Sequence, residues 1–246
     1  PSDVALFVDG GEQKVLVANQ QSMDATVIDA LTAEFVTVDV GDPVDRVIKY
    51  PEIAPEVAVL FCQASPRNRV YFLDLGGVEE SRGRNLTSLD GVQPIRSVEM
   101  IPGRAQALVI HDDSRSVMSI LDLNERTLSP FTGHSGLVDY AITSSGEVFA
   151  GHTQIHDQVG IVSLNTLAAR TVVVEHTPSQ VFTLEVGTGS DSDADLRSVV
   201  IDHGEPFGLI TVLPNPLEDT ADTTFVLRGF LLDGIFDYPW EEFLED

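Results

Sequence analysis

Three of the six histidines stand directly after the apolar part of a β-type run, where side chains of this kind could do chemistry. They are His111, His152 and His203, and the same loops hold Asp112, Asp113, His156 and Asp157. Imidazoles and carboxylates in corresponding loops of neighbouring repeats can converge on a cation or a polar ligand. We therefore predict a ligand-binding groove formed by these seven residues. The alternative is that polar residues simply end strands there.

A second acidic stretch has the spacing of a metal-binding loop. Asp191, Asp193 and Asp195 alternate with other residues, and Asp202 stands at the twelfth position counted from Asp191. Alternating carboxylates are typical of calcium loops, whose sixth position is a glycine because the chain turns sharply there. Leu196 occupies that position here, and a hairpin rich in Gly, Ser and Asp needs no metal. Calcium is the one candidate ion, and no other cofactor is expected.

Local catalytic motifs are absent from the sequence, so we assign no catalytic residue. It has no Gly-x-Ser-x-Gly elbow, no His-Glu-x-x-His pair and no phosphate-binding Gly-x-x-x-x-Gly-Lys loop. It has no Cys-x-x-Cys-His haem motif either, and its one cysteine, Cys62, lies in an apolar run. These absences count against a nucleotide enzyme and a redox propeller. A propeller hydrolase stays open, because such sites assemble residues from different blades.

The net charge of −25, from 39 acidic and 14 basic residues, limits the partners of this chain. A surface this negative repels nucleic acid phosphates and anionic membranes. No apolar run approaches the roughly 20 residues that a membrane-spanning helix needs. We therefore predict no nucleic acid partner and no insertion of this segment into a membrane.

Short β-type runs separated by turn residues position these candidates. Residues 4–8, 14–19, 24–31 and 34–40 are joined by connections too short for a crossover helix, so consecutive strands must pair antiparallel. The same pattern recurs along the chain with no helical periodicity. It predicts five four-stranded blades, at residues 4–41, 46–90, 95–132, 137–176 and 180–230, followed by a closing segment at 231–246.

An anchor position in the third run of each unit measures the period. It is occupied by Asp29, Asp74, Asp122 and Ser163, at spacings of 45, 48 and 41 residues. Units of four strands that recur every 40 to 50 residues are typical of β-propeller blades, because one such sheet cannot bury both faces alone. The sequence therefore predicts an all-β propeller in a single domain spanning residues 1–246.

The first unit resembles the YVTN-type β-propeller repeat. The matching elements are the tetrad at residues 16–19, the Val-Ile-Asp run at residues 27–29, Thr32 in the turn and Gly41 at the end. WD40 repeats fit less well, because Gly133-His134 is followed by no Trp-Asp pair. Propellers of the YVTN type are typically seven-bladed, so the resemblance leaves two readings: a five-bladed ring, which we favour, or part of a seven-bladed ring.

A strong repeat without a reaction signature favours a non-catalytic module. We expect a binding or scaffold protein of the periplasm or the cell exterior that presents its loops to a protein, peptide or glycan. Some propellers that resemble this one are metal-dependent hydrolases or lactonases. That activity is the alternative, and its site would lie on the loops after the second strands.

Overall fold

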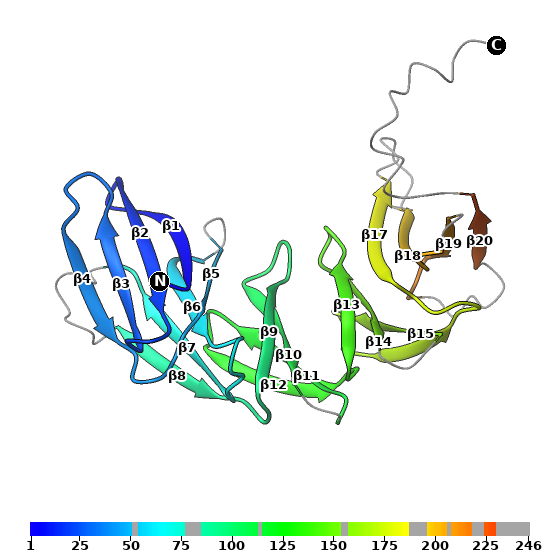
Figure 1. Cartoon of the computed structure of the whole chain (residues 1–246), viewed down its shortest axis with the longest axis horizontal. Helices are drawn as coiled ribbons and strands as arrows, with labels where there is room; N and C mark the ends of the chain where they lie inside the picture. The colour runs from blue at the N-terminus through cyan, green and yellow to red at the C-terminus, as the bar shows by residue number, and fades with distance from the viewer. Residues whose placement is uncertain are drawn as a thin grey trace, which may run out of the picture. The chain divides into compact units, whose positions relative to one another are not determined.

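The computed structural model describes residues 1–50, 54–76, 85–112, 115–153, 157–186, 196–205, 208–217 and 224–229. These residues form twenty β-strands in five four-stranded antiparallel sheets (Figure 1). Within the described ranges there is no helix, and so none that could cross a membrane. The all-β fold with five four-stranded blades is thus confirmed.

In each sheet the strands lie side by side in chain order. The first sheet contains β1 (Asp3–Asp9), β2 (Glu12–Asn19), β3 (Asp24–Asp29) and β4 (Phe35–Asp39). The second contains β5 (Arg46–Tyr50), β6 (Ala54–Phe61), β7 (Arg69–Asp74) and β8 (Leu86–Asp90). The third contains β9 (Ile95–Met100), β10 (Gln106–His111), β11 (Val117–Asp122) and β12 (Thr127–Thr132).

The remaining sheets repeat this order. The fourth contains β13 (Leu137–Ile142), β14 (Val148–Thr153), β15 (Gln158–Ser163) and β16 (Ala169–Val173). The fifth contains β17 (Gln180–Val186), β18 (Leu196–Asp202), β19 (Leu209–Pro214) and β20 (Phe225–Arg228). The strands of the five sheets span residues 3–39, 46–90, 95–132, 137–173 and 180–228.

Burial along a strand shows whether its sheet is covered on one face or on both. Along β2, buried Lys14, Leu16 and Ala18 alternate with half-buried residues, as in a strand with one well-covered face. Along β7 the four residues from Val70 to Leu73 are all buried. A continuous buried run requires apolar neighbours on both faces. The second sheet is therefore packed between two others.

Apolar cores lie between the first and second, the second and third, and the fourth and fifth sheets. Leu16 and Val27 of the first sheet pack with Leu60 and Leu73 of the second. The opposite face of the second sheet, which includes Phe72, packs on the third sheet through residues such as Leu121. The fourth and fifth sheets share a further core formed by Val148, Ile161, Val199, Ile201 and Leu213.

The repeated anchor residue closes the turn between the third and fourth strands. The Asp29 carboxylate accepts hydrogen bonds from the backbone N–H groups of Leu31 and Thr32, at 2.8 and 2.7 Å. Asp122 accepts the same two bonds from Asn124 and Glu125. Four residues after Asp29, Asp122 and Ser163 the backbone is left-handed, at Ala33, Arg126 and Leu167. The periodic Asp or Ser is therefore a turn residue.

First strands of neighbouring sheets are joined by another repeated bond. The Asp3 carboxylate of β1 accepts a hydrogen bond of 2.8 Å from the backbone N–H of Val47 in β5. Asp139 of β13 accepts the equivalent bond from Val181 in β17, also at 2.8 Å. Each bond spans about one repeat, 44 and 42 residues. These two bonds hold the first strands of the first and second sheets, and of the fourth and fifth sheets, in register.

The contacts divide the chain into two compact units, Pro1–Phe131 and Thr132–Asp246. The first contains the first three sheets, and the second contains the fourth and fifth. A single domain over residues 1–246 stays a prediction. The predicted closing segment, 231–246, lies outside the described residues.

The packing between the second and third sheets predicts a large effect of truncating Phe72, which is fully buried. We expect Phe72→Ala to lower the free energy of unfolding of the first unit by about 3–5 kcal/mol, because a cavity opens between two sheets. Urea titration followed by circular dichroism measures the change. Leu31→Ala is the control, since Leu31 is 94% exposed, and it should cost less than about 0.5 kcal/mol. Equal effects of the two variants would contradict the packing described.

Candidate functional site

His111 connects two parts of the chain through both of its ring nitrogens. The side chain is buried at the end of β10. Its Nδ1 lies 3.1 Å from the backbone oxygen of Gln93, in the linker that enters the third sheet. Its Nε2 lies 2.8 Å from the hydroxyl of Ser119 in β11. A carbonyl oxygen can only accept, so Nδ1–H donates, and Nε2 of the neutral ring accepts from the hydroxyl.

His203 makes the same pair of contacts in the fifth sheet. Its Nδ1 lies 3.2 Å from the backbone oxygen of Thr177, and its Nε2 lies 2.8 Å from the hydroxyl of Thr211. In both sheets the hydroxyl residue follows the histidine by eight positions. We call this arrangement the histidine tie, defined by His111 with Ser119 and His203 with Thr211. It joins the incoming linker to the third strand.

His152 acts differently, although it also follows the apolar part of a second strand. It lies on the face of β14 that carries Val148 and Ala150, which pack against the fifth sheet. Its Nε2 donates to the backbone oxygen of Ser179 at 3.0 Å. His152 therefore holds the linker that leaves its sheet, whereas the histidine ties hold the linker that enters.

The second unit gathers several predicted residues around one linker, at residues 174–179. His152 and His203 bind two of its backbone oxygens, and the ring of His176 lies edge-on to the ring of His203 with centroids 5.7 Å apart. Asp157 accepts a hydrogen bond of 3.0 Å from the hydroxyl of Thr177. The structure thus brings His152, Asp157 and His203 together, mainly through contacts with the backbone.

The other predicted site residues are placed as follows. Asp112 is exposed, and its backbone N–H donates to the oxygen of Pro94 at 2.8 Å. Asp113 and His156 lie outside the described residues, as do Asp191, Asp193 and Asp195 of the calcium loop. The Asp202 carboxylate accepts a bond of 3.0 Å from the backbone N–H of Gly204. Among the described residues no group of three or more His, Cys, Asp or Glu side chains could hold a metal. The ligand-binding and calcium roles stay predictions.

In the second sheet a carboxylate from the linker itself, and not a histidine, fastens the incoming linker. Asp45, buried in the linker before β5, accepts hydrogen bonds from the backbone N–H groups of Gln63 and Ala64 at 2.6 and 2.7 Å. It joins the incoming linker to the exit of the second strand β6. Three of the linkers that enter a sheet are thus fastened by a buried polar side chain.

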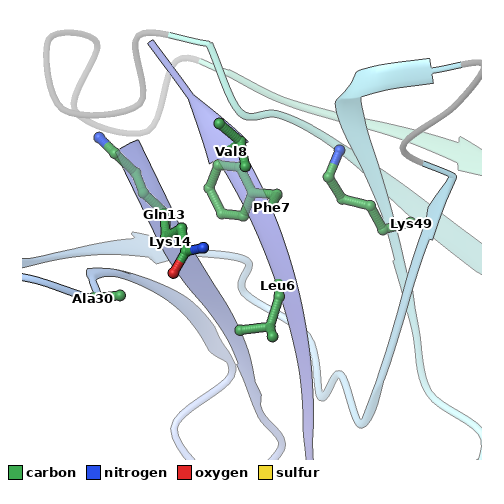
Figure 2. Close-up of a pocket in the computed structure, with 7 residues that line it drawn as sticks. All are labelled: Leu6, Phe7, Val8, Gln13, Lys14, Ala30 and Lys49. Atoms are coloured by element: carbon green, nitrogen blue, oxygen red, sulfur yellow. The ribbon is translucent and has the colours of Figure 1, made fainter. Parts of the chain in front are cut away.

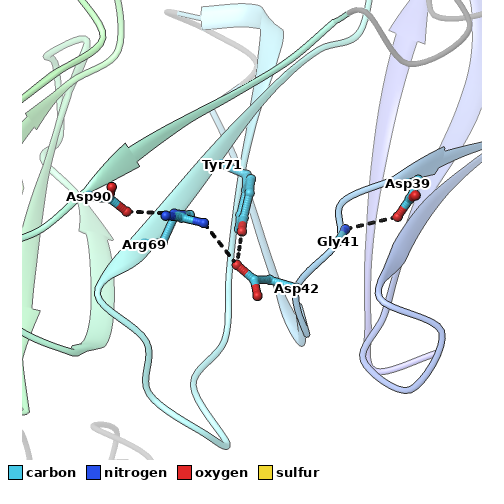
Figure 3. A network of polar contacts seen from close by, with 6 residues as sticks. All are labelled: Asp39, Gly41, Asp42, Arg69, Tyr71 and Asp90. Carbon is cyan, nitrogen blue, oxygen red and sulfur yellow. Dashed lines mark hydrogen bonds and ion pairs between the residues drawn. The ribbon is translucent and has the colours of Figure 1, made fainter.

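A polar network that sequence reasoning missed lies where the first and second sheets meet (Figure 3). Arg69 of β7 donates to Asp90 at 2.6 Å and pairs with Asp42 at 3.4 Å. The hydroxyl of Tyr71 donates to the same oxygen of Asp42. Asp42, Arg69 and Tyr71 face a groove of about 370 Å³, whose lining also includes Val40, Gly41, Leu86, Thr87 and Ser88.

The network shifts the pKa of three of its members. The hydrogen bond to Asp90 raises the pKa of Arg69. Burial raises the pKa of the Tyr71 phenol, and the hydrogen bond to the Asp42 carboxylate adds to this effect. The hydrogen bond from Arg69 lowers the pKa of Asp90. Asp42 belongs to a linker, whereas Arg69 and Tyr71 belong to a strand almost 30 residues later, so no local motif contains all three. The one signal in the sequence is the Arg-x-Tyr spacing, which places both side chains on the same face of a strand.

His134 covers a glycine of the fourth sheet. A Cβ added to Gly160 in β15 would overlap the ring of His134, so no larger residue fits there without displacing the ring. Desolvation lowers the pKa of His134 below the ordinary value of 6.5, although hydrogen bonds to the oxygens of Ile161 and Arg170 oppose the shift. The folded protein therefore favours the neutral ring.

This depressed pKa predicts a pH dependence of stability. The unfolded chain takes up a proton on His134 near pH 6.5, before the folded chain does, so the contribution of this group to stability is complete above pH 6.5 and is lost as the pH falls further. We expect the loss between pH 7.5 and 5.5 to be smaller in His134→Gln than in the unchanged protein. Urea titrations at both values measure it. Between pH 7.5 and 8.5 the two proteins should change in parallel, and parallel behaviour down to pH 5.5 would contradict the assignment.

Comparisons with known proteins agree with the fold. No protein-family model matches this chain, and no curated protein sequence matches it. Among solved structures, the chain is similar to dihydro-heme d1 dehydrogenase NirN in complex with DHE, with a TM-score of 0.57 and 12% sequence identity. The match covers 86% of this chain and 44% of that protein, so the chain spans less than half the length of its structural neighbour. At this identity the likeness shows the β-propeller fold alone.

Proposed function

We propose that this β-propeller is a non-catalytic binding or scaffold module that works outside the cytoplasm and presents its loops to a protein, peptide or glycan. The observation that carries the proposal is the use made of polar side chains, of which Asp45, His111 and His203 are buried and Asp3 and Asp139 are half-buried. Asp45, His111 and His203 hold linkers to strands, and Asp3 and Asp139 hold neighbouring blades in register. These polar side chains, which could otherwise bind a substrate, make the sheets and their linkers rigid. A stiff frame presents its loops in one geometry, which reduces the entropy lost on binding.

The groove beside Arg69 is the recognition surface that we assign to this function. Its polar groups already point in fixed directions, because Arg69 and Tyr71 both bind Asp42. Thr87 and Ser88 add exposed hydroxyls on β8. Alternating donors and acceptors of this kind match the hydroxyls of a glycan or the amides of a peptide.

The location and the ion content belong to the same proposal. A net charge of −25 suits a soluble surface outside the cytoplasm and disfavours nucleic acid as the partner. Calcium would bind, if at all, at Asp191, Asp193, Asp195 and Asp202. The activity named for the structural neighbour is not carried over, since only the fold is shared.

Glycan and peptide arrays, followed by titration of the strongest hit, test this proposal. We expect saturable binding that Ser88→Arg weakens at least tenfold, because a long side chain fills the groove. Thr171→Arg is the matched control, since Thr171 is also exposed on the fourth strand of a blade, and it should leave binding unchanged.

The same protein preparation tests the alternative, a metal-dependent hydrolase or lactonase. We expect no turnover of ester, lactone or glycoside substrates, with and without added divalent metal. Hydrolysis that survives repurification and disappears in Asp112→Asn or Asp157→Asn would overturn the proposal. So would the absence of any array ligand whose affinity depends on Ser88.

A further inference from the structure

The first sheet packs on the second sheet through one face, and its other face is also apolar. β1 carries Leu6, Phe7 and Val8 in succession (Figure 2). Phe7 belongs to the core shared with the second sheet, so Leu6 and Val8 lie on the opposite face of β1. They are 75% and 63% exposed. We call the side that carries Leu6 and Val8 the open face of the first sheet.

The strand register makes the open face of the first sheet a continuous apolar surface. One row crosses all four strands through Leu6, Val15, Ile28 and Phe35, and the row beside it begins with Val4 and Val17 and ends with two threonines. Neither row contains a charged residue, although the chain has 39 acidic and 14 basic residues. Phe35 is 69% exposed. A contiguous exposed apolar surface of this kind marks an interaction site.

The corresponding face of the second sheet is covered. The repeated anchors of the two sheets are Asp29 and Asp74. Ile28 stands one residue before the first anchor and Leu73 one residue before the second, so their positions correspond. Leu73 is fully buried against the first sheet, whereas Ile28 is half-buried. The open face of the first sheet therefore matches the face of the second sheet on which a preceding sheet packs.

The fifth sheet also has an open face, but of the opposite sense. Val181, Val199 and Ile201 belong to the core shared with the fourth sheet, so the residues that alternate with them point away from the fourth sheet. We call this side the open face of the fifth sheet. Its large exposed apolar residues, each 40–57% exposed, are Phe182, Leu184, Phe225 and Leu227.

Neighbouring sheets within each unit meet through faces of opposite sense. Every core described above joins the forward face of one sheet to the backward face of the sheet that follows it in the chain. The backbone N–H of Val47 also donates to Asp3 of the preceding sheet. Val4 stands at the position of Val47, and its N–H donates at 2.9 Å to its own neighbour Asp3. The open face of the fifth sheet is a forward face and that of the first sheet a backward face, so the two are complementary.

We propose that a second copy of this chain packs the open face of its fifth sheet on the open face of the first sheet. Both halves of this contact are present on the chain, and both are exposed in a single copy. The contact repeats the one that already joins the fourth and fifth sheets. It is head-to-tail, so a dimer keeps one open face at each end and can add further copies. It uses no residue that lines the groove beside Arg69, and it does not depend on the function proposed above.

Sedimentation velocity of the whole protein over a range of concentrations tests whether copies associate. We expect the mean mass to rise with concentration above that of one copy. Added salt should strengthen the association, because the contact is apolar while two copies of net charge −25 repel each other. The screening length falls from about 10 Å at 0.1 M salt to about 3 Å at 1 M, so the repulsion is largely removed.

Two variants test the head-to-tail arrangement, one on each open face. Leu6→Lys and Leu227→Lys should each weaken self-association at least tenfold, and both should keep the circular dichroism of the unchanged protein because both side chains are exposed. An equimolar mixture of the two should form a one-to-one dimer and nothing larger, since each variant retains one intact open face. Val92→Lys and Val173→Lys are the controls, because they change exposed valines outside the two faces, and they should associate like the unchanged protein.

Three results would overturn the proposal. The first is an unchanged protein that stays monomeric up to about 0.5 mM, because interfaces of standard size bind in the micromolar range or more tightly. The second is self-association that Leu6→Lys abolishes and Leu227→Lys leaves intact, which would mean that two first sheets pair with each other. The third is a mixture of the two variants that forms no dimer. Hydrogen exchange gives a further check: amides of β1 and β20 should gain protection only as the concentration rises, and full protection in the monomer would assign the cover to another segment of the same chain and reject the second copy.

Discussion

A four-stranded sheet with two apolar faces must be covered on both, and this constraint determines the structure. In the second sheet, β7 is buried without interruption from Val70 to Leu73, so alternate residues face different neighbours. Within the described residues no helix does the covering. Within each of the two units the sheets therefore cover one another, and the repeat is a consequence of this mutual burial.

Packing of sheets alone leaves the linkers between them unfastened, and buried polar groups supply the missing contacts. The histidine ties bind the linkers that enter the third and fifth sheets, and Asp45 does the same for the second sheet. An unsatisfied buried donor or acceptor costs about 1–3 kcal/mol, so each tie contributes to stability mainly by avoiding that loss. The first role of His111 and His203, at the ends of their second strands, is therefore structural.

The sequence predicted the features that depend on local pattern. The strand pattern and the five four-stranded sheets follow from short runs and turn residues, and the structure confirms them. Asp29 and Asp122, at the repeated anchor position, accept hydrogen bonds in the turns that follow β3 and β11. Whether His111, His152 and His203 lie on the same face of their strands was harder to predict, because a shift of one residue moves a side chain to the other face. His152 lies on the opposite face in this sense, and its contacts differ accordingly. The network of Asp42, Arg69 and Tyr71 joins distant segments, and no local pattern encodes it.

The central claim is that His111, His152 and His203 are structural residues that hold the linkers. The most direct test is to determine which ring nitrogen carries the proton in each of the three imidazoles. Long-range ¹H–¹⁵N NMR at about pH 8 reports which ring nitrogen carries the proton. The account predicts Nδ1–H for His111 and His203, because each Nδ1 faces a carbonyl oxygen, and Nε2–H for His152. Added zinc should leave the His111 and His203 signals in place. The opposite tautomers, or ring signals of these two histidines that shift with added zinc, would show that the imidazoles are available as ligands and would contradict the account.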